Sequence, residues 1–196
     1  MRFFKENSDN IIKLYINQIG IAIFAMFLYT AAGALSEKIP NSLAMKIFIS
    51  VFSIAFYFVL VYNVAWEIGA KDKIRVDGGR MEKNEKKGIL LGIYANSLNF
   101  AVVGVSIILS VLYITSGIDA FNTIFAVLNF LFRFFLSMYL GVIQGITASV
   151  TDESIAFLIQ TVLFFVFSAL SAVIVHVSYV LGLRDFRFFA TSKSQK

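Results

Sequence analysis

One arginine in the middle of a long apolar stretch carries the clearest chemical signal in this chain. The stretch from Asn122 to Gln144 reads NTIFAVLNFLFRFFLSMYLGVIQ, with Arg133 at its centre. Asn129 and Ser137 lie four residues to either side, so a helix would place all three on one face. A guanidinium in apolar surroundings needs a carboxylate, phosphate or carbonyl partner. The pattern predicts either a structural ion pair or a site for an anionic substrate or lipid headgroup.

A second polar row lies in the apolar stretch that runs from Ile89 to Thr115. Its members are small, amide or hydroxyl residues at steps of mostly three and four: Gly92, Asn96, Asn99, Ser106, Ser110 and Tyr113. Such a row lets helices approach one another closely and form hydrogen bonds in lipid. It therefore predicts helix packing. The alternative is that Asn96 and Asn99 contact a solute in a pocket shared with Arg133.

The remaining residues that could do chemistry do not indicate catalysis. His176 is the single histidine, and we expect a hydrogen-bonded packing residue there, with a proton relay or ligand contact as the alternative. The chain has no cysteine, which excludes disulfides and thiolate metal sites. The motifs H-E-x-x-H, G-x-S-x-G and G-x-x-x-x-G-K-[ST] are absent. We therefore expect no enzyme, no metal site and no cofactor.

Composition indicates a membrane protein. Apolar residues make up 59% of the 196 residues, and charged residues only 15%, whereas a soluble domain carries about 25%. The mean hydropathy is +0.81. Several apolar runs exceed about 18 residues, which is too long for core strands. We predict an all-α fold, a polytopic transmembrane helical bundle that forms one integral membrane domain over residues 1–196. The bilayer is its expected partner, and nucleic acid is not.

Five apolar segments are candidates for crossing the bilayer. They cover residues 14–35, 43–66, 89–115, 122–144 and 155–182. We predict four crossings plus a fifth apolar helix, 122–144, that is interfacial or re-entrant. Five full crossings are the alternative, because a segment of this length can span about 30 Å of hydrocarbon.

Charge between the second and third segments predicts the orientation. Residues 67–88 contain seven basic and five acidic side chains. Lys and Arg accumulate in short cytoplasmic loops of membrane proteins. This stretch is therefore predicted to be a cytoplasmic loop, and two crossings place the N-terminus on the same side. Because acids offset most of the bases, internal salt pairing or contact with a protein partner fits the loop better than an anionic-lipid patch.

The basic C-terminal tail, residues 183–196, favours the four-crossing arrangement. Five crossings would leave ten basic residues inside and six outside. If segment 122–144 does not cross, fourteen lie inside and two, Lys38 and Lys46, lie outside. The second count follows the rule of positive charge inside more closely. We therefore expect a multi-pass protein of a cell membrane, of the bacterial inner-membrane type, with both termini in the cytoplasm.

Three functions are compatible with these observations. The leading hypothesis is a non-catalytic accessory or structural subunit of a membrane assembly, which meets a protein partner through residues 67–88 and the small-residue helix faces. We also consider a homo-oligomer. The second is a solute-binding or permease subunit of a transporter, and the third is an anionic-lipid-binding protein. Both alternatives draw on the same candidate binding residues: Arg133, Asn129, Ser137, Asn96, Asn99 and His176. A solute pocket would need an enclosed polar cavity above about 300 Å³ near Arg133.

Overall fold

The computed structural model describes residues 2–36, 42–116, 127, 130–131 and 133–187, and these residues form helices without any strand. Asn129 and the first residues of segment 122–144 lie outside the described residues. The elements are α1 (Arg2–Ser36), α2 (Ser42–Asp77), α3 (Lys86–Ala95), α4 (Ser97–Ser116), the 3₁₀ turn η1 (Ser137–Tyr139), α6 (Leu140–Thr147) and α7 (Glu153–Leu183).

Three of these helices are long and apolar enough to cross a membrane. They are α1 over Phe3–Ala34, α2 over Leu43–Asp77 and α7 over Ile155–Leu183. The helices α3 and α4 meet this criterion only as a pair, and they are bent by 59° relative to each other. The described chain therefore has three such helices, or four if the bent pair is one span. This agrees with a multi-pass membrane protein built entirely from helices.

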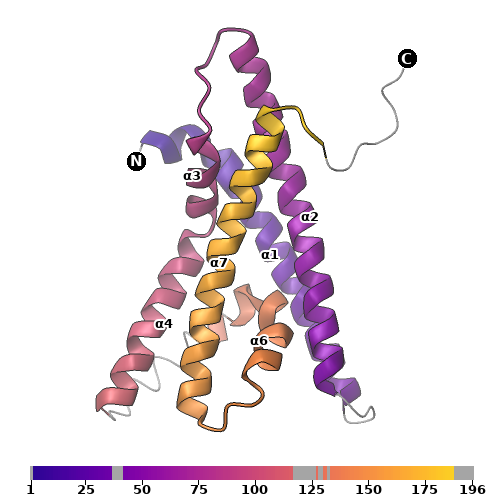
Figure 1. Ribbon diagram of the computed structural model, residues 1–196, viewed down its shortest axis with the longest axis vertical. Helices are drawn as coiled ribbons and strands as arrows, with labels where there is room; N and C mark the ends of the chain where they lie inside the picture. The colour runs from indigo at the N-terminus through magenta and orange to yellow at the C-terminus, as the bar shows by residue number, and fades with distance from the viewer. Residues whose placement is uncertain (1, 37–41, 117–126, 128–129, 132, 188–196) are drawn as a thin grey trace.

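The helices form a bundle that opens towards one end (Figure 1). The start of α1, the connection between α2 and α3, and the end of α7 lie at the upper end in this view. The ends of α1 and α4 and the start of α7 lie at the lower end, where α6 sits between α7 and α2. Large apolar side chains are exposed on the outside, among them Phe27 (71%), Phe48 (70%) and Ile108 (61%). A hydrocarbon surrounding accommodates such a surface, whereas water disfavours it.

Glycine residues allow the close crossing of α2 and α7. A Cβ atom added at Gly69 would lie 2.1 Å from the backbone oxygen of Tyr179, and one at Gly182 would lie 2.2 Å from that of Trp66. On α3, a Cβ atom at Gly92 would lie 2.5 Å from the backbone oxygen of Ala172. None of these distances leaves room for a methyl group. Small residues therefore set the separation of the helices, as is typical of packing in lipid.

The helix expected over 89–115 is interrupted at Asn96. The backbone N–H of Asn96 donates to the carbonyl oxygen of Gly92 at 3.1 Å, and its side-chain amide donates to the same oxygen at 3.0 Å. Its φ and ψ angles of −99° and 7° are not those of a helix. An Asn side chain that bonds to nearby backbone competes with helix propagation. The pattern of apolar residues does not reveal this competition, so the sequence predicted one straight helix.

The fourth apolar segment does not form one straight helix in its described part. Residues 133–135 are helical, Leu136 is a turn, and η1 and α6 follow. The helix α6 has eight residues, which corresponds to a length of about 12 Å. That is less than half of the hydrocarbon thickness of about 30 Å.

The charged stretch 67–88, expected as a loop, is helical over its first half. The helix α2 continues to Asp77, about three turns beyond Trp66. Ion pairs at helical spacing support this extension: Lys71 with Glu67, and Lys73 with Asp77 at 3.3 Å. Only residues 78–85 connect α2 to α3, starting with a turn in which Gly79 has a φ of +69°. The charged stretch is therefore a helical hairpin with a short connection.

Candidate functional site

Arg133, in the fourth apolar segment, contacts α7, and only part of its guanidinium has a hydrogen-bond partner among the described residues. Its Nη2 donates to Oε1 of Gln160 at 3.1 Å, and Nε2 of Gln160 donates in turn to Oγ1 of Thr147 at 3.0 Å. The Nε atom of Arg133 is buried, and no described residue forms a hydrogen bond with it. No ion pair joins Arg133 to a carboxylate among the described residues. The structural ion pair considered for this arginine is therefore not found in that part of the chain.

A second cation lies close to the same place. The Nζ atom of Lys46, on α2, is 5.7 Å from the centre of the Tyr29 ring, within the range of a cation–π interaction. Tyr29, on α1, donates its hydroxyl hydrogen to Oε1 of Gln144 and lines the same cavity as Arg133. Two cationic side chains from different elements are therefore neighbours of one tyrosine ring.

The described end of the fourth segment packs closely against α1 and α2. The backbone N–H of Gly141 donates to Oγ of Ser50 at 2.7 Å, and a Cβ atom on Gly141 would lie 2.0 Å from the backbone oxygen of Lys46. Ser137 donates to the carbonyl oxygen of Ala22 at 2.6 Å. Ser137 was expected in one row with Arg133, but the chain turns at Leu136, so its hydroxyl binds the α1 backbone instead.

The cavity beside Arg133 is small and lies at the outside of the bundle. Its volume is about 110 Å³, and its lining is mostly apolar: Met26, Tyr29, Thr30, Phe130, Arg133, Phe134 and Leu140. Thr30 and Phe130 are exposed. The volume is well below the roughly 300 Å³ at which small-molecule sites begin. This cavity therefore does not match the enclosed polar pocket that a solute site would need.

Asn96 and Asn99 belong to a separate buried network. Asn99 donates to Oδ1 of Asn96 at 3.4 Å, and Asn96 reaches Oγ of Ser171 on α7 at 3.5 Å. The same Ser171 oxygen shares a hydrogen bond of 2.6 Å with the hydroxyl of Tyr57 on α2. Asn96 is 2% exposed and Asn99 3%. These amides join three helices to one another, and no hydrogen bond between described residues connects them to Arg133.

His176 lies far from Arg133 along α7. Sixteen residues separate it from Gln160, the hydrogen-bond partner of Arg133, which is about 24 Å along a helix. Its Nδ1 atom is buried and has no hydrogen-bond partner among the described residues. A Cβ atom on Gly88 would lie 3.1 Å from the Cα atom of His176, so α3 packs directly over this position. The candidate residues thus divide into separate groups.

A buried ion pair that the sequence did not indicate joins α2, α3 and α7. Lys87 donates to Oδ2 of Asp72 at 2.7 Å, and the hydroxyl of Tyr179 donates to the same oxygen at 2.9 Å. The side chains of Asp72 and Lys87 are only 2% and 11% exposed. One sequence pattern could have indicated that Asp72 faces the bundle. It lies three residues after Gly69, and if α2 continues through this stretch the two residues share a helix face. We call Asp72, Lys87 and Tyr179 the hairpin cluster.

The end of α7 also contacts α2. The indole N–H of Trp66 donates to the backbone oxygen of Phe186 at 2.7 Å, and the Arg187 guanidinium lies 4.1 Å from the Trp66 ring centre. Asp185, two residues after the end of α7, has a left-handed backbone conformation with a φ of +57°. These contacts, together with the hairpin cluster, fix the upper end of the bundle.

Comparison with known protein families, with curated proteins and with solved structures gives no match. Within the described part of the chain, no group of three or more His, Asp or Glu side chains is arranged to hold a metal ion. The function must therefore be argued from the charges, cavities and contacts of this chain itself.

Proposed function

We propose that this chain is a non-catalytic accessory subunit that crosses a cell membrane four times and acts by binding another protein of the same assembly. The passes are α1, α2, the bent pair α3–α4, and α7, with η1 and α6 entering from the far end without crossing. The arrangement in Figure 1 supports this, because the start of α1, the hairpin and the end of α7 lie together. The distribution of Lys and Arg favours the cytoplasm for that end.

The observation that carries the proposal is the fixed conformation of the charged hairpin. The end of α2 and residues 78–85 extend beyond the other helices (Figure 1), and the hairpin cluster holds their base against α7. Keeping positive charge on one side requires no particular loop conformation. Burying an ion pair, in contrast, carries a desolvation cost. A loop that only keeps positive charge on one side of the membrane would have no reason to bury such a pair. A defined surface supports a role in binding a partner.

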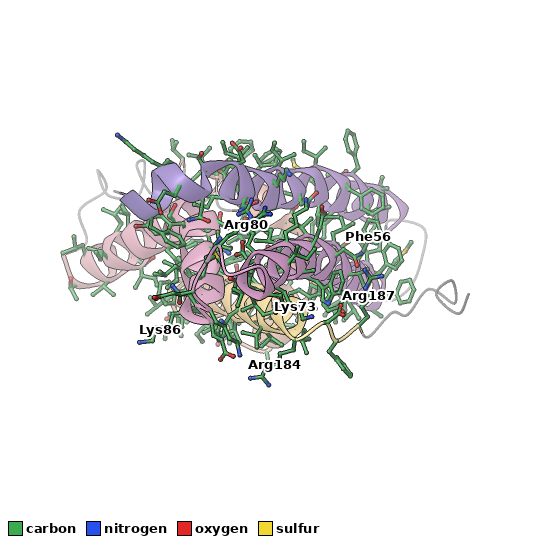
Figure 2. All side chains as sticks on the ribbon, turned by 90° about the horizontal axis from the view of Figure 1, so that it is seen from above. Phe56, Lys73, Arg80, Lys86, Arg184 and Arg187 are labelled. Carbon is green, nitrogen blue, oxygen red and sulfur yellow. The ribbon has the colours of Figure 1, made fainter. Side chains whose placement is uncertain are left out.

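The exposed side chains of the hairpin are mostly charged. Figure 2, viewed onto this end, shows Lys86 and Arg184 pointing away from the bundle. Glu85 pairs with Lys83 at 2.9 Å and with Arg184 at 3.6 Å, and the hydrogen bond with Lys83 lowers the pKa of the Glu85 carboxyl. Arg80 and Lys86 are exposed and basic. A mixed surface with an excess of base suits a protein partner with acidic side chains.

The solute-binding alternative has less support. The cavity at Arg133 has about 110 Å³, and Asn96 and Asn99 bond to each other. A solute subunit would need these groups to face an open polar space. The geometry near Arg133 therefore supports the accessory role over the transport role.

Site-directed crosslinking in native membranes tests the proposal. Glu82→Cys places a single thiol on the exposed hairpin of a chain without cysteine, and Ser149→Cys places one on the exposed turn at the opposite end. We expect a bifunctional thiol–amine crosslinker to give one defined adduct from position 82 and none from position 149. The pair Lys83→Glu and Lys86→Glu should abolish that adduct.

The mass of the adduct identifies the kind of partner. Twice the mass of the chain would indicate a second copy, and any other mass a different protein. Identical adducts from both positions, or no adduct from position 82, would contradict the proposal. Co-purification of a stoichiometric small solute without any protein would favour the transport alternative instead.

A further inference from the structure

The charge balance around the fourth segment is the starting point. Arg133 and Lys46 both lie next to Tyr29, and neither forms an ion pair with a carboxylate in the described part of the chain. The polar groups that surround them are neutral: Tyr29, Gln144, Thr147 and Gln160. A cation within the membrane region is costly unless an anion compensates for it. Among the described residues, no carboxylate compensates these two positive charges.

The hydrogen-bond geometry leaves a donor available. Among the described residues, only Nη2 of Arg133 has an acceptor, and that acceptor is the neutral amide oxygen of Gln160. The Nε atom is buried and has no acceptor within the described part of the chain, although leaving a buried donor unpaired is costly. A guanidinium binds phosphate oxygens through two parallel N–H groups. The unused Nε therefore fits an anion with several acceptor oxygens.

The cavity is accessible from the outer surface of the bundle. Thr30 and Phe130, which line it, are exposed, and Phe27, one turn before Thr30 on α1, is 71% exposed. A ligand would therefore enter from the side that faces lipid in the proposed membrane arrangement. Its volume is about 110 Å³, and Arg133 is the charged residue in a lining that is otherwise mostly apolar.

The position along the helices matches the interface region of a bilayer. Lys46 lies one turn after the start of α2 at Ser42, and Tyr29 lies about two turns before the end of α1 at Ser36. Tyrosine rings and lysine ammonium groups are favoured at this level of a membrane. This step rests on the proposed four-pass arrangement, in which this end faces away from the cytoplasm.

We infer that Arg133 and Lys46, together with Tyr29, form a binding site for a phosphate-bearing anion, and that this anion is the headgroup of an anionic phospholipid. The phosphodiester would accept hydrogen bonds from the Arg133 guanidinium. The Lys46 ammonium would add a second positive charge, and the acyl chains would lie along the exposed apolar face of α1. An anionic phospholipid is favoured over a zwitterionic one because the site offers two cations and no described carboxylate to a headgroup ammonium.

Lipid retention measured by native mass spectrometry tests this inference on the full chain. The protein is released from detergent in the presence of equal amounts of phosphatidylglycerol and phosphatidylcholine. We expect a strong preference for phosphatidylglycerol, weakened about tenfold or more in Arg133→Gln and less in Lys46→Gln. The control is Lys71→Gln, which removes a cation that already pairs with Glu67 at the other end of the bundle. It should leave the preference unchanged.

A second arm separates lipid from soluble phosphate. Thermal unfolding in detergent is followed with inorganic phosphate and with phosphatidylglycerol. Stabilisation by the lipid that exceeds any effect of phosphate at equal ionic strength supports the assignment. Equal stabilisation by phosphate, with no further gain from lipid, would overturn the lipid source.

Two results in the lipid-retention experiment would overturn the binding site. An unchanged lipid preference in Arg133→Gln, or no preference in the wild type, would overturn the site itself. If Arg133→Gln fails to fold, Arg133→Lys keeps the charge and should retain a reduced preference. Lys46→Gln should still weaken the preference, and an unchanged preference in both variants would overturn the site. Crosslinking at position 82 concerns the opposite end, so failure of the accessory proposal can be told apart from failure of this one.

Discussion

Removing the carboxylate of the hairpin cluster should destabilise the protein strongly. In Asp72→Ala the Lys87 ammonium, 11% exposed, loses its partner at 2.7 Å, and the Tyr179 hydroxyl loses its acceptor at 2.9 Å. Removing one partner of a buried ion pair costs about 3–5 kcal/mol, because the other charge stays buried. For a chain of this size, a loss of about 3 kcal/mol corresponds to a decrease in Tm of roughly 6–12 °C.

The double variant separates the ion pair from simple loss of packing. Asp72→Ala combined with Lys87→Met removes both charges, and it should recover most of the lost stability because replacing both partners with apolar groups is often close to neutral. The control is Asp77→Ala on the same helix, which breaks an exposed pair with Lys73. That pair should contribute no more than about 1 kcal/mol.

Two measurements check these values. Thermal unfolding in detergent, followed by the fluorescence of Trp66, the single tryptophan, gives the change in Tm. Limited trypsin digestion at Arg80 and Lys83 reports whether the hairpin alone has opened. The reasoning is refuted if Asp72→Ala unfolds at the wild-type temperature, or if the double variant is as unstable as the single one. Either result would mean that the buried pair contributes no coupling energy.

Two further predictions concern the packing and the topology. Gly69→Ala should lower the Tm and weaken the contact between α2 and α7, because the new methyl group would lie 2.1 Å from a backbone oxygen. The control is Gly20→Ala, where nothing lies within 4 Å, and this change should be neutral or stabilising by about 0.5–1 kcal/mol. Equal effects of the two changes in thermal unfolding would contradict the close crossing. Single cysteines at Ser149 and Ser194 should be labelled by a membrane-impermeant maleimide from opposite sides of the membrane. Labelling of both from the same side would exclude four passes.

Hydrophobicity along the chain was sufficient to predict the helical membrane class. In a bilayer, each apolar segment must satisfy the hydrogen bonds of its own backbone, and a helix does this. This requirement depends on one segment at a time and not on which helices pack together. The composition and the position of Arg133 in an apolar run are likewise properties of neighbouring residues. These features could be derived without knowing which helices meet.

Contacts between distant segments decided the rest. Asp72 and Tyr179 are 107 residues apart, and Ser137 and Ala22 are 115 apart, yet each pair is joined by a hydrogen bond. The spacing of Ser137 from Arg133 predicted a shared face, but the turn at Leu136 removed it.

The sequence by itself determined a helical protein with several apolar segments long enough to cross a bilayer, because periodicity and hydrophobicity are local properties. Only the tertiary structure decided that α2 extends through the charged stretch, that the third segment bends at Asn96, and that Arg133 and Lys46 share Tyr29 as a neighbour. The physical reason is that the burial of a charge and the free donors of a side chain depend on which helices pack together. Spacing along one helix does not contain that information.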